Sequence, residues 1–435
     1  MSTHTEIRLW GNRIAVVSMD STDAVARFEY ARDFLSSGIE LSPIAMPLAK
    51  RVYRFPELSE VSFHGLPGLL ADSLPDKFGN ALIDTWLATQ GRTRESFDAV
   101  ERLCYIGKRG MGALEFSPVR GPRPRKSEVL HVGELVELAS DILQHRKALP
   151  THFRPGESSE ALKEILRVGT SAGGARAKAV IAWHPETGEV RSGQVEAPEG
   201  FGYWLLKFDG VSGNRDKESA DPQGYGRIEY AYSLMAKAAG IEMTDCRLLE
   251  ENGRAHFMTR RFDRLPDGGK LHMQTLGGLA HFDYNMAGAY SYEQALQVIR
   301  QLGLGMDALL EQLRRMIFNI IARNQDDHVK NIAFLMDKRG QWQLSPAYDL
   351  IYSYNPDGAW TSRHQMTVNG KRDHFTLADI AACAESADIP KQKVPKIIEE
   401  VNAAVGLWPD FAEEAKVDAA TRDRISQSLR VESFA

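Results

Sequence analysis

Residues 323–335, RNQDDHVKNIAFL, hold several chemically capable side chains in one short stretch. Asp326 and Asn331 stand five residues apart, after a helical pattern and before an apolar run. In phosphoryl-transfer enzymes an aspartate accepts the proton of the attacking hydroxyl, and an asparagine five residues later binds a metal ion. Asp327 is only four residues from Asn331. We therefore predict Asp326 as the catalytic base.

A third position of this kind is Asp349, in the segment SPAYDLI, eighteen residues after Asn331. A second metal-binding aspartate at a strand end is the other ligand that a phosphoryl-transfer site needs. Each of these residues alone is better explained as part of a polar turn. Together, at these spacings, they favour a magnesium–nucleotide site with Asn331 and Asp349 as metal ligands.

A lysine and a glycine-rich segment supply groups that suit phosphate. Strand alternation in YWLLKFDG places Lys207 among apolar neighbours, where its amine needs a phosphate or a carboxylate such as that of Glu229. The segment VGTSAGGARAK lies between the apolar runs ILRV and AVIAW, a pattern that predicts strand, loop and strand. It is not a Walker loop, because Ala175 stands where lysine is required. Its place before a strand with an interior lysine favours a cover over ATP.

The elements that position these groups follow from periodicity. A β-rich half with the glycine segment and Lys207 precedes an α-rich half with the acids, an order that predicts a nucleotide between two lobes. A Pro- and Arg-rich stretch at 117–126 predicts a linker. We expect two short strands within 6–20, and helices at 80–89, 129–147, 227–240 and 306–323. The expected divisions are 1–116, 117–264 and 265–435.

Composition excludes some classes of protein. The chain has 435 residues, 43% of them hydrophobic, and a formal net charge of −5, so no general basic field indicates nucleic acid or an anionic membrane. No apolar run reaches the roughly 18 residues of a membrane-spanning helix. The N-terminus lacks a signal-peptide pattern, and the three scattered cysteines predict reduced thiols in the cytoplasm.

The sequence resembles the HipA family of bacterial serine/threonine kinase toxins over nearly its whole length. The resemblance is carried by GLPGLLADSLPD, TSAGGARAKA, WLLKFD and RRFDR, and most specifically by NQDDHVKNIAFL and LSPAYDLIYS. It implies an α+β, bilobal protein-kinase-like fold. A small N-terminal α/β subdomain (1–116) would precede a β-rich nucleotide-binding lobe and an α-rich C-terminal lobe.

The resemblance also implies roles by position. Asp326 matches the catalytic base, Asn331 and Asp349 the magnesium ligands, and Lys207 the lysine that contacts ATP phosphates. Ser171 matches an autophosphorylated serine, with Thr170 as the alternative acceptor. The remaining positions implied at the nucleotide are Gly173 and Gly174 of the glycine segment, Arg260, Phe262 and Asp263 of the hinge, His328 and Tyr348.

The implied activity is that of an ATP- and Mg²⁺-dependent protein serine/threonine kinase. Its implied substrate is a protein serine, with an aminoacyl-tRNA synthetase such as glutamyl-tRNA synthetase as the favoured type. The implied partner is a small HipB-like helix-turn-helix antitoxin, through which DNA is contacted only indirectly. The chain departs from the best-known members at Arg176-Ala177, where they have Gln-Glu, and at Arg260, which replaces the hinge acid. A catalytically weak scaffold for an antitoxin–operator complex and a small-molecule kinase are the alternatives.

Overall fold

A computed structural model describes residues 2–20, 22–122, 129–145, 160–169, 176–211, 223–431 and 434. Its first unit is an antiparallel sheet with the strand order β4-β3-β2-β1-β5. The two strands predicted within 6–20 are confirmed, joined by a tight turn at Trp10 and Gly11, both with positive φ. The strands are β1 (Ser2–Leu9), β2 (Asn12–Asp20), β3 (Asp23–Tyr30), β4 (Val52–Tyr53) and β5 (Leu114–Ser117).

The second unit is an antiparallel sheet with the order β7-β6-β8-β10-β9. Helices α4 (Lys77–Thr89), α6 (Val132–His145) and α8 (Glu160–Val168) share a core with one face, and α9 (Tyr225–Ala238) packs on β9 and β10. The strands are β6 (Lys178–Trp183), β7 (Val190–Ser192), β8 (Gly202–Lys207), β9 (Cys246–Glu251) and β10 (Arg254–Arg260).

The prediction of a strand at ILRV, before the glycine segment, is wrong. These residues end the helix α8, and the side chains of Leu162, Ile165, Leu166 and Val168 are buried. The spacing of Leu162, Ile165 and Leu166 is that of one helix face, so the pattern becomes clear only when the preceding turn is included. The helices expected at 80–89, 129–147 and 227–240 are confirmed as α4, α6 and α9.

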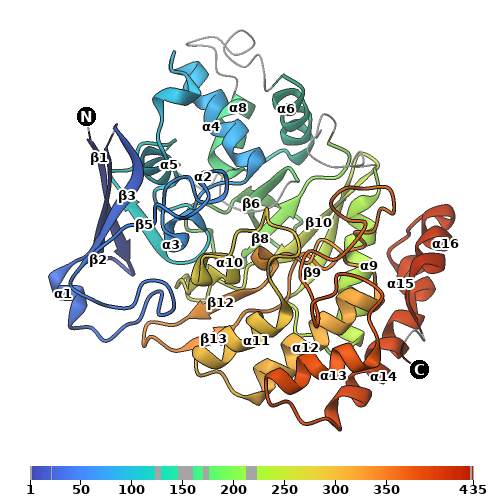
Figure 1. The fold of residues 1–435 in the computed structure, drawn as a ribbon. Coiled ribbons are helices and arrows are strands. Elements are labelled where there is room, and N and C mark those ends of the chain that lie inside the picture. The colour runs from blue at the N-terminus through green and yellow to red at the C-terminus, as the bar shows by residue number, and fades with distance from the viewer. Residues whose placement is uncertain are drawn as a thin grey trace.

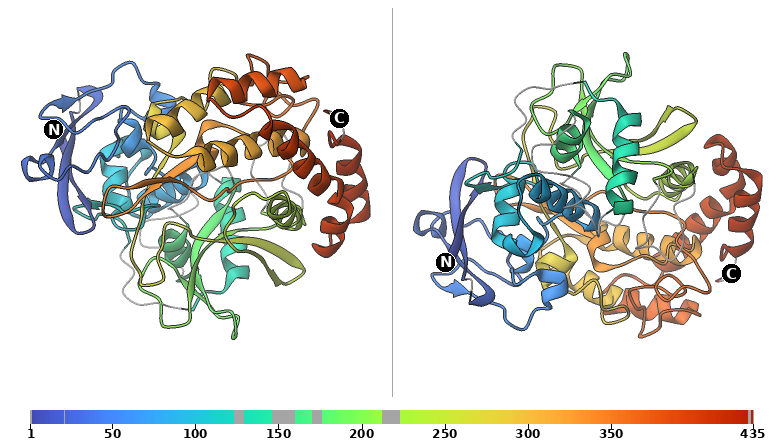
Figure 2. Two further views of the ribbon diagram at one scale, coloured as in Figure 1. Left: turned by 90° about the horizontal axis from the view of Figure 1, so that it is seen from below. Right: turned by 90° about the horizontal axis from the view of Figure 1, so that it is seen from above.

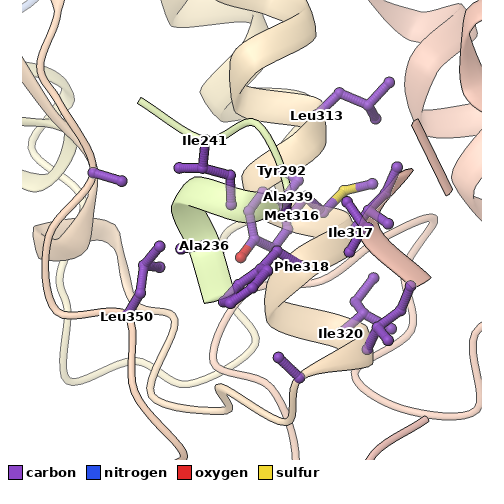
Figure 3. Close-up of a cluster of buried hydrophobic side chains, with 14 of the residues drawn as sticks. Ala236, Ala239, Ile241, Tyr292, Leu313, Met316, Ile317, Phe318, Ile320 and Leu350 are labelled. Carbon is purple, nitrogen blue, oxygen red and sulfur yellow. The ribbon is translucent and has the colours of Figure 1, made fainter. Parts of the chain in front are cut away.

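The C-terminal part surrounds a three-stranded sheet of order β11-β12-β13, formed by His272–Thr275, Ala333–Met336 and Trp342–Leu344. Its largest core lies around α12 (Met306–Ile321), the predicted helix, whose apolar face buries Leu313, Ile317 and Ile320 (Figure 3). The other long helices are α11 (Tyr292–Gln301), α13 (Leu377–Ser386), α14 (Lys393–Gly406), α15 (Trp408–Glu414) and α16 (Ala419–Ser428).

The N-terminal sheet and the helices α15 and α16 lie at opposite ends of the molecule (Figures 1 and 2). Between them, the sheet that contains β6 and β8 forms one half, and α11 to α14 form the other (Figure 2). The fold is therefore mixed α and β, with the β-rich and α-rich halves in the predicted order. Helix α4 precedes the boundary predicted at 116/117 but shares the core of the second sheet. This boundary and the one at 264/265 stay predictions.

The N-terminal unit is joined to the C-terminal part by short helices. α3 (Gly68–Ala71) packs on α10 (Leu276–Ala280), and Asp72 accepts hydrogen bonds from the backbone N–H (2.7 Å) and hydroxyl (2.8 Å) of Thr275. The remaining short helices are α1 (Arg32–Leu35), α2 (Glu60–Phe63), α5 (Ala99–Ile106) and two 3₁₀ turns at Arg94–Ser96 and Val329–Asn331.

Candidate active site

The small C-terminal sheet brings two distant segments to one edge. Strands β12 and β13 are antiparallel, with Phe334 opposite Leu344, so the start of β12 and the end of β13 lie together. The loop of residues 324–331 enters β12, and Asp349 follows β13 after a hydrogen bond from Ser345 N to Ala333 O (2.9 Å). The predicted base and metal ligands therefore come from the same end of one sheet.

The loop of residues 324–331 begins where α12 stops. Arg323 has a φ of +56°, in the left-handed region, which ends the helix after its C-cap Ala322. Asn324 N donates to Asn319 O (3.0 Å), and the Asn324 side chain donates to Asn319 Oδ1 (2.9 Å). The first residue of the loop is thus fixed to the last turns of a buried helix.

Lys207 is the centre of the charged cluster. Its side chain is 8% exposed, and its amine pairs with Glu229 of α9 and with Asp349. Burial disfavours the charge of Lys207, but the carboxylates of Asp349 and Glu229 outweigh it and raise its pKa above the usual range. The expectation that this lysine has an anionic partner is confirmed, and in this structure the partners are carboxylates.

Asp349 is held in place by its backbone and by its charge. Its φ is +54°, which is uncommon for a residue other than glycine. Burial would raise its pKa, but Lys207, helped by Lys178, lowers it to about 2. Asp349 is therefore ionised at neutral pH, as a ligand of a hard cation must be.

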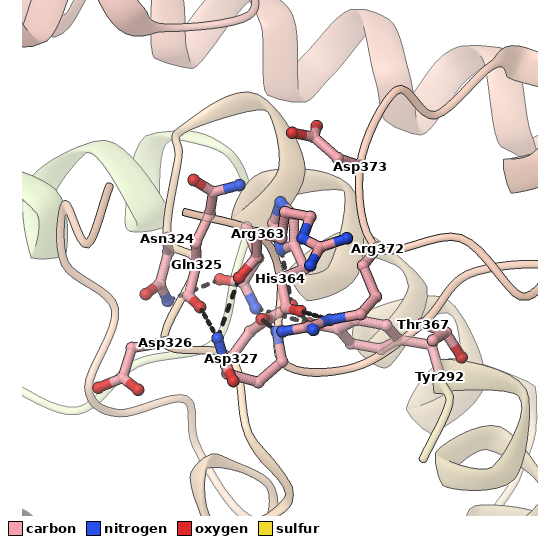
Figure 4. Close-up of polar contacts among 12 residues, drawn as sticks. Tyr292, Asn324, Gln325, Asp326, Asp327, Arg363, His364, Thr367, Arg372 and Asp373 are labelled. Atoms are coloured by element: carbon pink, nitrogen blue, oxygen red, sulfur yellow. Dashed lines mark hydrogen bonds and ion pairs between the residues drawn. The ribbon is translucent and has the colours of Figure 1, made fainter. Parts of the chain in front are cut away.

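The two neighbouring aspartates have opposite environments. The Asp326 side chain is 44% exposed and that of Asp327 is 1% exposed. Asp327 accepts from the Tyr292 hydroxyl (2.8 Å) and from Gln365 N (2.8 Å), and its Oδ2 lies 2.8 Å from His364 Nδ1. Figure 4 shows these bonds around Asp327, with the Asp326 carboxylate turned away from them. Of the two carboxylates, that of Asp326 is the one accessible to solvent.

The donor set next to Asp326 suits magnesium. Asn331 donates through Nδ2 to Asp326 O (2.8 Å), and within the described chain its Oδ1 accepts no hydrogen bond. An amide oxygen and an ionised carboxylate, those of Asn331 and Asp349, are ligands that Mg²⁺ accepts. The residues therefore fit the metal that the sequence predicts.

Residues predicted near the nucleotide lie around this cluster. Phe262 and Tyr348 have ring centroids 5.8 Å apart, and the Tyr348 hydroxyl donates to Lys330 O (2.6 Å). His328 Nε2 lies 3.9 Å from Asp326 Oδ1. The Arg260 side chain is exposed, and its guanidinium lies 3.8 Å from Asp245, away from Asp326 and Asp349 in the sequence and paired with a different carboxylate.

The carboxylate of Asp263 has partners within the protein. Its side chain is fully buried and pairs with Arg261 (2.7 Å) and Arg264 (2.8 Å) while accepting from Gly112 N (2.6 Å). Burial opposes its charge, but the two arginines hold its pKa well below the usual range. Asp263 therefore joins its own segment to the loop before β5, and its place at the nucleotide stays a prediction.

The glycine segment lies outside the described residues from 170 to 175, so the positions predicted at Ser171, Thr170, Gly173 and Gly174 have no structural account. The residues that follow are described. Arg176 Nη1 lies 3.2 Å from Glu229 Oε2, and Lys178 Nζ lies 3.1 Å from Asp76 Oδ2. Glu229 thus contacts two cations, Lys207 and Arg176.

Sequence reasoning missed Trp360, His364 and Gln365, which contact the loop of residues 324–331. The Trp360 indole N–H donates to Asp326 Oδ1 (2.7 Å). Each of these residues stands at least 34 positions after the aspartate that it contacts, in a stretch with no helical or strand periodicity. No local signal in the sequence could have found them.

Comparisons with known proteins identify the fold. A Shewanella oneidensis HipA, solved in a complex with HipB and operator DNA, aligns with a TM-score of 0.69 and 18% identity. The alignment covers 99% of this chain and 97% of the HipA chain, which shows a shared fold. Within the described residues, no helix is long and apolar enough to cross a membrane.

Two Sinorhizobium fredii proteins are related in sequence. "Putative kinase Y4mE" is 28% identical over 214 residues, and "Putative kinase Y4dM" is 27% identical over 248 residues. The matches cover 45% and 52% of this chain, and the chain spans about half the length of each relative, 50% and 56%. The "HipA N-terminal domain" model matches residues 5–117, and the "HipA-like C-terminal domain" model matches 170–408. The chain belongs to the HipA family.

Proposed function

We propose that this protein is an ATP- and Mg²⁺-dependent protein serine/threonine kinase. One observation carries the proposal: Lys207 joins Glu229 to Asp349 at the edge of the sheet where Asp326 and Asn331 also lie. A strand lysine paired with a helix glutamate, a base and two metal ligands are the recurring parts of a kinase site. A polar turn needs no such convergence from four separate elements.

Each residue has a proposed role. Asp326 accepts the proton of the attacking hydroxyl, because its carboxylate is accessible and Asp327 is not. Asn331 and Asp349 hold the metal, and Glu229 orients Lys207 toward phosphate when Asp349 turns to the cation. When bound, Mg²⁺ and ATP supply the phosphoryl group and neutralise its charge. Phe262 and Tyr348 provide an aromatic surface for the adenine ring of ATP.

The biological context is proposed from the family. The HipA, HipB and operator DNA complex supports a HipB-like helix-turn-helix antitoxin as the partner, with DNA contacted through it, and a role as the toxin of the pair. We propose a protein serine as the acceptor, with an aminoacyl-tRNA synthetase as the favoured class, and a cytoplasmic location.

Transfer of label from [γ-³²P]ATP to proteins of a cell extract tests the activity. The wild type is expected to label one or a few proteins, and Asp326→Asn to label them about 10²-fold more slowly. Asp307→Asn, an exposed acid at the far end of α12, is the matched control and should label like the wild type. Equal labelling by wild type and Asp326→Asn would refute the role of the base.

Autophosphorylation at Ser171 is proposed on the position of this serine in the glycine segment. Intact-mass and peptide measurements after long incubation with Mg²⁺-ATP should find one phosphate in the wild type and none in Ser171→Ala. Thr170→Ala is the control and should keep the modification. Loss of the phosphate in Thr170→Ala alone would move the site to Thr170.

A further inference from the structure

Residues 360–365, which we call the covering segment, lie directly on the loop of residues 324–327. The Gln365 side chain donates to Gln325 O (3.1 Å) and Arg363 O (3.0 Å), and also to Trp360 O. Its backbone N–H donates to Asp327 (2.8 Å). Both ends of the covering segment are thus fixed, one through Trp360 O and the other through Asp327.

Trp360 turns from this anchored segment toward the predicted base. Its indole N–H donates to Asp326 Oδ1 at 2.7 Å, a charge-assisted geometry. Asp326 is half exposed, so without a donor its carboxylate could rotate freely in solvent. Among the described residues, this is the one side-chain hydrogen bond that its carboxylate accepts.

We propose that Trp360 is a positioning residue for phosphoryl transfer, which holds Asp326 so that Oδ2 faces the acceptor hydroxyl. This inference rests on the proposed kinase function. The indole N–H engages one carboxylate oxygen only, and the second oxygen keeps its lone pairs for the proton. Because Trp360 O is tied to Gln365, and Gln365 to the same loop, donor and acceptor belong to one rigid unit.

The same arrangement predicts which kinetic constant changes. Lys207 pairs with Asp349 and Glu229, and Asn331 donates to the Asp326 carbonyl, whereas the Trp360 indole donates to the Asp326 carboxylate. Nucleotide binding should therefore not depend on the indole. A misdirected base costs rate because the near-attack geometry is formed less often. The effect should appear in kcat and leave KM for ATP unchanged.

Trp360→Phe removes the N–H donor and keeps an aromatic ring. With myelin basic protein as the acceptor and [γ-³²P]ATP as the donor, we expect kcat to fall about tenfold, with KM for ATP within about twofold. Trp342→Phe is the matched control, because it removes an indole bond to Glu40 O (3.2 Å) elsewhere in the molecule and should not change kcat. A Trp360→Phe kcat equal to or above that of the wild type would overturn the proposal.

A second measurement does not need activity. The protein has seven tryptophans, so ¹⁵N-tryptophan labelling gives seven indole N–H resonances, and Trp360→Phe identifies one of them. That resonance should move in Asp326→Ala and the other six should not. An unmoved Trp360 resonance would exclude the contact. Wild-type protein that labels neither myelin basic protein nor an extract would refute the kinase function, while a moved resonance would still establish the contact.

Discussion

Two adjacent acids, Asp326 and Asp327, are tolerated because their side chains lie in different environments, one exposed to water and the other buried. Asp327 is buried with three donors or ring nitrogens around it, from Tyr292, Gln365 and His364, and these contacts offset the cost of burying its charge. The carboxylate of Asp326 is exposed to water. The sequence alone favours Asp326 by spacing, and the structure adds a physical reason for the difference.

Asp327→Asn should therefore reduce stability. An amide at this position points one NH₂ at a donor and removes the charge that strengthens the other bonds, which costs about 1–3 kcal/mol. A fall in Tm of the purified protein measures it. Asp326→Asn, exposed and one residue away, is the control and should keep the wild-type Tm. The reverse order of the two melting temperatures would contradict the assignment.

Lys207→Ala and Asp349→Ala should both weaken binding of Mg²⁺-ATP. Each removes a charged partner of the phosphates or of the cation, which we expect to reduce affinity at least about tenfold in calorimetric titration. Asp349→Ala should also abolish the dependence of ATP affinity on Mg²⁺, and Lys207→Ala should keep it. Lys237→Ala, an exposed lysine at the end of α9, is the control. Wild-type affinity in both variants would leave these residues with a structural role only.

The residues that could be predicted share a property. Asp326, Asn331, Asp349 and Lys207 stand in short motifs whose spacing is read along the chain. Their partners from distant segments, such as Trp360 for Asp326 and Asp76 for Lys178, depend on the fold and leave no local pattern. The hydrogen bond from Gly112 to Asp263, across 151 positions, is of the same kind.

At the level of elements, long periodic segments were predictable and short ones were not. Helix α12 shows its apolar face over four turns, whereas the four-residue helix α3 has too few positions for a period. The last turn of helix α8, residues 165–168, resembles a short strand when it is taken alone. The pairing of β12 with β13, which brings the predicted base close to the predicted metal ligand Asp349, follows from the short connection between the two strands.

The contact between α3 and α10 depends on Gly68. A Cβ built on Gly68 would lie 2.2 Å from the carbonyl oxygen of Gly278, and a backbone atom cannot move aside as a side chain can. Gly68→Ala should push α3 away from α10 and lower stability by about 1–3 kcal/mol. A lower Tm and earlier proteolytic release of the N-terminal unit would show it.

Gly305→Ala is the control for this substitution. A Cβ at Gly305 meets no atom within 4 Å, and its φ is −75°. Its position before the first residue of α12 allows a loss of about 1 kcal/mol at most. Equal melting temperatures for Gly68→Ala and the wild type would show that the two helices separate without cost.

At the scale of the whole molecule, three histidines with lowered pKa values lie at different places in the fold, two of them buried and one, His281, half-buried. His256 lies in β10 of the second sheet, His272 in β11 of the C-terminal sheet, and His281 accepts from Gly68 N (3.0 Å) where the N-terminal unit is attached. Burial lowers the pKa of each of these histidines to about 4. The order of the parts was predictable from sequence, but these internal histidines were not, because a lone histidine has no pattern.

These histidines predict that the protein loses stability in mild acid. In the unfolded chain a histidine has a pKa of about 6.5, so between about pH 6.5 and 4 the unfolded state binds protons that the native state does not. Stability is therefore present above pH 6.5 and falls as the pH decreases, by up to about 4 kcal/mol per pH unit when all three contribute.

Tm measured from pH 7.5 to 4.5 should decrease steeply below 6.5. His272→Phe keeps a ring beside Trp342 and should make the decrease shallower, whereas His4→Phe, at an exposed position of β1, should not change it. A Tm that is constant from pH 6.5 to 4.5 would contradict the neutral state of these histidines.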